Sequence, residues 1–248
     1  MRILVINPNI SESVTDLIAK EAQRVASPGT ELTFATAPFG TSFIETRIEA
    51  VIAGYASACV AADHHGEYDG VFLACFGEPG VLGLKEMLDV PVVGMTEAAL
   101  ASACLLGQRF SIIAISPRIK AWYLETVERS HLTTRLASIR SLQDPLRDIG
   151  TIQEDYSERL VELAKETVEK DGADVIILAG APLAGLARTL EGKLPVPVVD
   201  GVSSAIRHCE SLIALNPGVA VEGSLAKPPL KPNKGLPPAL AAMLNRTC

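Results

Sequence analysis

Short apolar runs alternate with longer mixed segments along most of the chain. The short runs are rich in Val, Ile and Leu and are bounded by Gly, Pro, Asn or Asp, which predicts buried strands. They lie at residues 2–8, 31–38, 71–75, 90–95, 110–116, 175–180 and 196–201. The mixed segments are rich in Ala, Leu, Glu and Lys, which predicts helices. These lie at 11–26, 43–62, 97–107, 117–131, 155–171 and 202–215. Strands that alternate with helices predict an α/β fold with mainly parallel sheets.

The order of these elements occurs twice. In the first half, a strand ending in Asn7-Pro8-Asn9 precedes VFLACFG and then VPVVGMTEAAL. In the second half, a strand ending in Ser116-Pro117-Arg118 precedes VIILAGA and then VPVVDGVSSAI. The first two segments are also similarly spaced, from position 3 to 71 (68 positions) and from 112 to 175 (63 positions). We interpret the pattern as a duplication. It predicts two pseudo-symmetric lobes, each a mainly parallel sheet flanked by helices.

The duplication also predicts the domain boundaries and the place of a ligand site. Residues 1–100 with part of 200–220 should form the first lobe, and residues 101–200 the second. Residues 216–248 contain the Pro- and Lys-rich KPPLKPNKGLPP and should form an irregular tail. Ligands of open α/β sheets bind beyond the carboxyl ends of the strands. We therefore expect one cleft between the lobes, lined by the turns at 7–9, 75–77, 116–118 and 180–182.

Composition and charge indicate which kinds of molecule the protein binds. Apolar residues make up 48% of the chain and aromatic ones only 4%, so Ala, Val, Leu and Ile must build the core. A net charge of −7 argues against nucleic-acid binding and favours a small-molecule substrate. No apolar stretch reaches the ~20 residues of a membrane span, and the N-terminus lacks the pattern of a secretion signal. We expect a cytoplasmic protein without membrane contact, and its Ala-rich lobes favour a homo-oligomer.

Several familiar motifs of cofactor and hydrolase chemistry are missing. The chain has neither a phosphate-binding G-x-x-x-x-G-K-[ST] loop, nor a well-placed G-x-G-x-x-G, nor a G-x-S-x-G elbow. The five cysteines include no C-x-x-C pair, and the four histidines show no ligand spacing. No nucleotide cofactor and no metal are therefore indicated.

Cys75 is the strongest candidate for chemistry. It ends a strand that reads as buried, and it directly precedes the turn Phe76-Gly77-Glu78-Pro79-Gly80 before a further helix. A helix N-terminus stabilises anions, so we expect the pKa of this thiol to lie below its usual value of about 8.5. The backbone amides of Phe76 and Gly77 could hold a carboxylate or an enolate oxygen. The other cysteines fit inert positions better: Cys59, Cys104 and Cys209 in helices, and Cys248 at the end of the chain.

The segments MRILVINPNIS, ACFGEPG, GMTEAAL, RFSIIAISPR and VPVVDGVSSAIRHCESL together resemble the hydantoin and allantoin racemases of the aspartate/glutamate racemase superfamily. The similarity runs from residue 1 to about 215. It implies two similar α/β lobes, a cleft between them and no cofactor. It also implies a cysteine from each lobe on opposite sides of an acidic carbon. One thiolate removes a proton and the other thiol returns one from the opposite face.

This sequence departs from that pattern at the second cysteine. Cys75 matches the first, but the second lobe has Ala179-Gly180 where the resemblance implies Gly-Cys. Three explanations remain open. Ser116, Ser203, Glu78 or a water serves the second face; or the enzyme works from one face, like arylmalonate decarboxylase; or only ligand binding remains. A small Gly180-Ala181-Pro182 wall would also leave room for a bulkier substituent.

The neighbouring polar residues receive roles as substrate ligands. Asn7 and Asn9 could bind the amides of a ureide or a carboxylate, although Asn-Pro-Asn is also a common turn. Thr96 either reaches the cleft or caps the helix that follows it. Arg118 could bind an anionic group with two hydrogen bonds or form an exposed ion pair. We thus predict a cofactor-independent racemase acting beside a carbonyl, with Cys75 as its acid/base.

Overall fold

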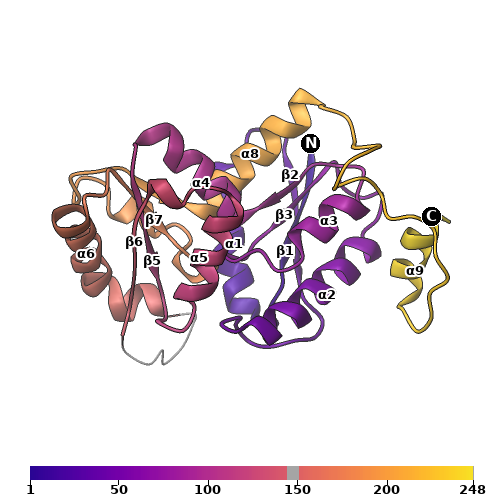
Figure 1. Ribbon diagram of the computed structural model, residues 1–248, viewed down its shortest axis with the longest axis horizontal. Helices are drawn as coiled ribbons and strands as arrows, with labels where there is room; N and C mark the ends of the chain where they lie inside the picture. The colour runs from indigo at the N-terminus through magenta and orange to yellow at the C-terminus, as the bar shows by residue number, and fades with distance from the viewer. Residues whose placement is uncertain (144–150, 248) are drawn as a thin grey trace.

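The computed structural model describes residues 1–143 and 151–247, and it contains two parallel four-stranded sheets (Figure 1). The strand order is β2-β1-β3-β4 in the first sheet and β6-β5-β7-β8 in the second. The elements of the first half are β1 (Arg2–Asn7), α1 (Glu12–Val25), β2 (Glu31–Thr36), α2 (Arg47–Asp63), β3 (Gly70–Leu73), α3 (Val81–Met87), β4 (Val92–Gly94) and α4 (Met95–Leu106). Those of the second half are β5 (Phe110–Ala114), α5 (Lys120–Arg129), β6 (Leu136–Ser141), α6 (Ile152–Asp171), β7 (Val175–Leu178), α7 (Leu186–Thr189), β8 (Val198–Asp200) and α8 (Gly201–Leu215).

The α/β fold and its repeat are confirmed. Each strand of the first sheet has a counterpart at the same place in the second, and every strand pair is parallel. The central strands β1, β3, β5 and β7 consist almost entirely of buried apolar residues. This burial on both faces explains why they read as continuous apolar runs rather than as alternating ones.

Four elements of the repeat differ from the sequence-based expectation. The edge strand β6 was not predicted, because its residues LASIRS are polar in part and mostly half-buried. The helices α3 and α7 are only seven and four residues long, which is too short to give a periodic pattern. The helix predicted over 43–62 begins only at Arg47, since the Thr46 side chain and Glu49 form a capping box there. Residues 43–46 are therefore free to reach the site described below.

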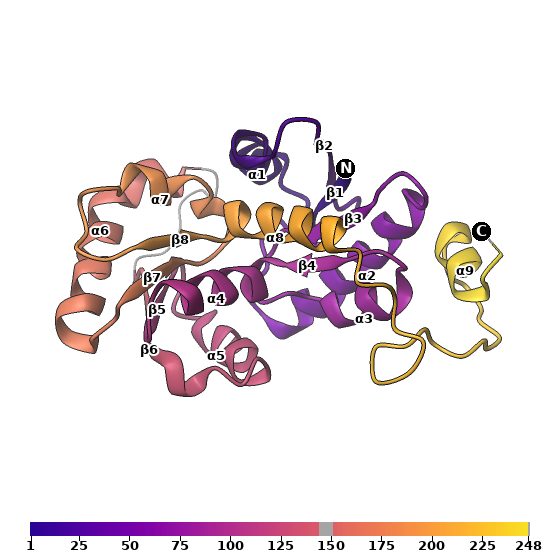
Figure 2. The same cartoon turned by 90° about the horizontal axis from the view of Figure 1, so that it is seen from above.

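The last helix of each half packs on the sheet of the other half. Helix α4 contacts β7 and β8, whereas α8 contacts β3 and β4, and the two helices also contact each other. Figure 2 shows them side by side between the two sheets. The largest apolar core includes residues of both sheets and of both helices. The halves are thus joined by an exchange of helices as well as by the chain itself.

The C-terminal segment is less irregular than expected. It contains α9 (Pro238–Asn245), which packs on α2 beside the first sheet. Leu240 is buried there against Cys59 and Ala62, and this apolar contact gives the helix a partner. No helix in the described ranges is long and apolar enough to cross a membrane.

Candidate active site

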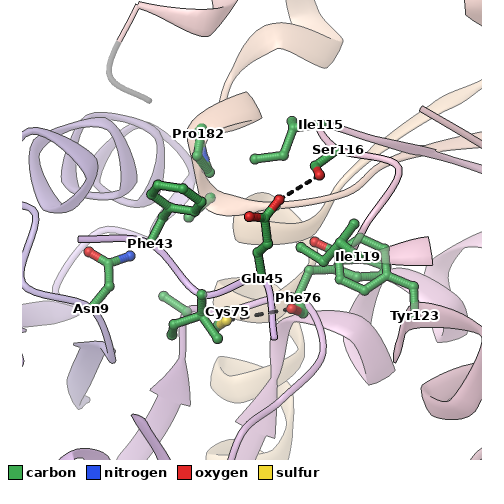
Figure 3. A pocket seen from close by; sticks show the side chains of 14 residues that line it. Asn9, Phe43, Glu45, Cys75, Phe76, Ile115, Ser116, Ile119, Tyr123 and Pro182 are labelled. Carbon is green, nitrogen blue, oxygen red and sulfur yellow. Dashed lines mark hydrogen bonds between the residues drawn. The ribbon is translucent and has the colours of Figure 1, made fainter. Parts of the chain in front are cut away.

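A pocket lies where strand ends of both sheets come together (Figure 3). It encloses about 480 Å³ of empty space, including the part open to solvent, which suits a small molecule. Its walls come from the ends of β3, β5 and β7, from the turn after β1, from the segment before α2 and from α5. The lining residues are Asn9, Phe43, Ile44, Glu45, Ala74, Cys75, Phe76, Ile115, Ser116, Ile119, Tyr123, Gly180, Ala181 and Pro182.

Cys75 lies just beyond the end of β3, on the floor of this pocket. Its thiol is partly accessible and makes only a long contact of 3.5 Å with the carbonyl oxygen of Phe76. Burial, with a smaller contribution from the negative charge of Glu78, raises the pKa of the Cys75 thiol to about 12. The expected lowering of this pKa is therefore wrong. Helix α3 begins only at Val81, after a left-handed Gly80, and among the described residues no Lys or Arg lines the pocket to stabilise a thiolate.

Asn9 forms one side of the pocket and is held by its own turn. Its side-chain oxygen accepts hydrogen bonds from Asn7 Nδ2 (3.1 Å) and from the Ser11 N–H (2.8 Å). These two bonds identify which atom of the amide is the oxygen. The Asn9 nitrogen is consequently the group that points into the pocket (Figure 3). Asn7 itself is buried and also donates to Thr15 Oγ1 (2.9 Å), so it supports Asn9 from behind.

A carboxylate and a hydroxyl join the two halves across the pocket. Ser116, just beyond β5, donates its hydroxyl proton to Glu45 Oε1 at 2.6 Å, as the dashed line in Figure 3 marks. Glu45 belongs to the segment before α2 and is half-buried. It is the carboxylate of the pocket wall, so it gives the site an acceptor for N–H groups.

Gly180 occupies in the second half the position that Cys75 occupies in the first. The preceding residue makes the same backbone bond to the central strand of its sheet: Ala74 N–H donates to β1 at 2.8 Å, and Ala179 N–H donates to β5 at 2.9 Å. Gly180 has φ +112° and ψ 144°, a backbone conformation that is nearly confined to glycine. The backbone of the second turn therefore has a conformation that requires glycine at position 180.

Of the ligands predicted from sequence, the pocket brings together Asn9, Cys75, Phe76, Ser116 and residues 180–182. The others lie behind or beside it. Thr96 is buried and its hydroxyl accepts a hydrogen bond from the Gly77 N–H at 2.9 Å, so both stabilise the turn after Cys75. Arg118 is exposed on the surface, and its backbone N–H donates to Ser116.

Two of the groups considered for the second face are elsewhere. Glu78 is buried with φ +57°, accepts a hydrogen bond from the Glu97 N–H and pairs with Arg129 at 2.9 Å. Burial raises the pKa of Glu78 to about 7. Ser203 donates to Glu21 in a separate surface depression. Neither residue lines the pocket around Cys75.

Sequence reasoning missed Phe43, Glu45, Ile119 and Tyr123. The first two belong to a segment predicted as helix, and the last two lie at the start of α5. The rule that ligands bind at strand ends cannot find residues that come from a neighbouring loop or helix. The capping pattern Thr46-x-x-Glu49 was the available signal that the chain before residue 46 is not helical.

Metal binding has no support within residues 1–143 and 151–247, where no three His, Cys, Asp or Glu side chains gather as a ligand set.

The two similar sheets and the pocket at their strand ends suit a small molecule, and comparison with known proteins identifies the family of this chain. The family model described as Asp/Glu/hydantoin racemase matches residues 3–209. The hydantoin racemase of Paenarthrobacter aurescens is 38% identical over 233 residues, which cover 92% of this chain and 98% of that protein.

Two solved allantoin racemases have the same fold over nearly their full length. The enzyme from Klebsiella pneumoniae has a TM-score of 0.92 and 32% identity, with 97% of this chain and 98% of that chain covered. The enzyme from Pseudomonas fluorescens has a TM-score of 0.89 and 35% identity, with 95% and 100% covered. The chain belongs to the Asp/Glu/hydantoin racemase family, and it is an isomerase of the racemase type.

Proposed function

We propose that this protein racemises a hydantoin, a ureide or a related amino-acid derivative at the acidic carbon beside a carbonyl, with Cys75 as acid/base. The observation that carries the proposal is a partly accessible thiol just beyond the end of β3, inside a small pocket with amide and carboxylate groups around it. The relatives named above are hydantoin and allantoin racemases, which supports this substrate class.

The raised pKa of Cys75 suits the reaction. A thiolate with a pKa of about 12 is a stronger base than an ordinary thiolate, so it is closer in strength to the weakly acidic carbon that it must deprotonate. Phe43, Phe76 and Ile119 give the pocket apolar walls around this thiol. The same burial makes the thiolate scarce at neutral pH, so the reaction should speed up as pH rises.

The polar groups of the pocket fit a ureide. Asn9 Nδ2 can donate a hydrogen bond to a carbonyl oxygen, where negative charge develops as the carbon loses its proton. Glu45, oriented by Ser116, can accept hydrogen bonds from a substrate N–H on the other side. A flat ring or chain that carries alternating C=O and N–H groups would satisfy both at once.

The direct test is solvent exchange in heavy water. Single enantiomers of allantoin and of a 5-substituted hydantoin are incubated with the enzyme, and proton NMR follows deuterium uptake while polarimetry follows inversion. Wild type should exchange and invert the substrate, and Cys75→Ser should lose about 100-fold or more of both. Cys104→Ser is the matched control, because Cys104 is a half-buried thiol outside the pocket. Absence of exchange in wild type on every substrate, or normal exchange in Cys75→Ser, would contradict the proposal.

Gly180 favours a second candidate, a lyase that decarboxylates a malonate-type acid and protonates the product from one face. That reaction needs only one proton donor, and Cys75 supplies it. It predicts release of carbon dioxide and a product with one deuterated centre of a single hand. The full-length similarity to racemases makes it the less favoured alternative.

Two further properties are part of the proposal. We expect a cytoplasmic enzyme, in line with its acidic composition. We also expect self-association, because α2 exposes Ile48, Val51 and Tyr55 at helical spacing on one face. Light scattering of the purified protein tests the second expectation.

A further inference from the structure

The turn that lacks a second thiol has a phenol beside it. An ideal Cβ placed on Gly180 would lie 3.8 Å from the hydroxyl oxygen of Tyr123 and 3.6 Å from a carbon of Pro182. Both are ordinary contact distances, so the Tyr123 hydroxyl adjoins the place where a side chain at position 180 would begin. It reaches this place from α5, an element of the second half.

The surroundings fix the Tyr123 ring and leave its hydroxyl free. The ring centroid lies 4.6 Å from that of Phe76 and 6.2 Å from that of Trp122, so aromatic packing holds it from two sides. In Figure 3 the hydroxyl is directed into the pocket. Within the part of the chain that the structure describes, it makes no hydrogen bond, although the residue is 2% exposed. No described side-chain oxygen is both fully buried and without a partner, so the Tyr123 oxygen is accessible from the pocket and ready to bond a ligand.

The other hydroxyl of the pocket is already engaged. Ser116 has a single proton, which it donates to Glu45 at 2.6 Å, and its oxygen accepts from the Arg118 N–H at 3.2 Å. Glu45 comes from the first half, the same half as Cys75. Tyr123 is the proton-bearing group of the second half that adjoins the Gly180 turn.

We propose that the Tyr123 hydroxyl is the second acid/base of this enzyme, serving the substrate face opposite Cys75. The inference rests on the proposed racemase function. In one direction the Cys75 thiolate takes the proton from carbon while the Tyr123 O–H gives its proton to the other face, which leaves a thiol, a phenolate and the inverted substrate. In the reverse direction the phenolate takes the proton and the Cys75 thiol returns one. One C–H bond breaks and one forms in each direction, and no further reactant is required.

The electrostatics of the pair agree with this alternation. Burial raises the pKa of the Tyr123 phenol well above its usual value, and negative charge on Cys75 raises it further. The thiol and the phenol therefore disfavour each other's ionisation. The racemase reaction needs one of them ionised and the other protonated.

The test separates inversion from exchange in Tyr123→Phe. Without the phenol, Cys75 can still remove a proton from one enantiomer and return a deuteron to the same face. We expect inversion to fall about 100-fold or more, while deuterium uptake into that one enantiomer stays within about tenfold of wild type. Tyr68→Phe is the matched control, since Tyr68 is a buried tyrosine whose hydroxyl donates to the Ala61 carbonyl away from the pocket. It should behave as wild type.

The remaining outcomes overturn the inference. Normal inversion in Tyr123→Phe would show that the phenol transfers no proton, while the role of Cys75 would stand. An equal loss of inversion and of exchange for both enantiomers would assign Tyr123 a structural role only. If inversion fell while deuterium uptake persisted in Glu45→Gln, and not in Tyr123→Phe, the second acid/base would be the Glu45 carboxylate. Absence of any exchange in wild type would remove the proposed function, and the inference with it.

Discussion

The turns after β3 and β7 occupy equivalent places in the repeat, but the first carries a thiol and the second carries glycine. Cys75 lies at the start of the first turn and Gly180 at the start of the second, at equivalent positions two residues after their strands. The supports behind them are comparable. Thr96 at the start of α4 accepts from Gly77 N–H, and Asp200 at the start of α8 accepts from Gly185 N–H. The two turns thus share a similar support although only one of them carries a reactive side chain.

The two turns also differ in why they require glycine. Gly77 has φ +102° and would place a Cβ 2.5 Å from a ring carbon of Trp122, whereas a Cβ on Gly180 would meet only ordinary contacts. The first turn needs glycine for space and for backbone conformation. The second needs it for conformation alone. A cysteine introduced at position 180 would therefore be strained, but it would not clash.

The sharpest test of this contrast is a pair of alanine substitutions. Gly180→Ala should lower the free energy of unfolding by about 1–3 kcal/mol, because alanine rarely adopts this φ. Gly77→Ala should lower it by roughly 3 kcal/mol or more, because the clash with Trp122 adds to the same backbone cost. Urea denaturation measures both. Equal losses would mean that Trp122 moves aside and that the two turns are equivalent in space.

The pH dependence of activity tests the environment of the thiol in the first turn. Because the pKa of Cys75 is raised to about 12, the reactive thiolate increases tenfold per pH unit well below that value. Between pH 6.5 and 8.5, kcat/KM should therefore rise about 100-fold. The rate measured with Cys75→Ser is subtracted as background. A plateau near pH 8 would mean that a cation or dipole stabilises the thiolate after all.

Glu45→Gln tests whether the carboxylate of Glu45, which lines the pocket, binds the substrate. The amide keeps an acceptor for Ser116 but loses the charge that would bind a substrate N–H. Hydrogen bonds to charged groups contribute about 1.5–3 kcal/mol, so KM should rise about 10- to 100-fold with a smaller change in kcat. Steady-state kinetics give both constants. An unchanged KM would rule out Glu45 as a substrate ligand.

Thr96→Val should have the smallest effect. It removes the acceptor of the buried Gly77 N–H and should lower the free energy of unfolding by about 1–2 kcal/mol. Thr96→Ser keeps the hydroxyl and serves as the control, with urea denaturation again as the measurement. Identical stability of the two variants would show that the turn after Cys75 does not depend on this bond.

The parts predicted well from sequence are those that depend on burial along a strand. Apolar runs located β1, β5 and β7, and the order of segments revealed the repeat. The strand-end rule then brought Cys75, Ser116 and Gly180 into one pocket. Glu45 and Tyr123 were missed because a side chain from a loop or a helix reaches a site only through tertiary packing. The direction of the Cys75 pKa was missed for a similar reason, since surrounding protein decides it and local sequence does not.

The exchange of α4 and α8 has a consequence for how the protein could be divided. Each half carries the helix that covers the other half's sheet. For example, the side chains of Cys209 and Ile213 in α8 pack closely against Gly70 of β3. A chain cut at Gly107 would leave each fragment with one bare apolar sheet face and one helix with nowhere to pack. Each half is therefore expected to depend on the other for its stability, so that neither fragment should fold alone.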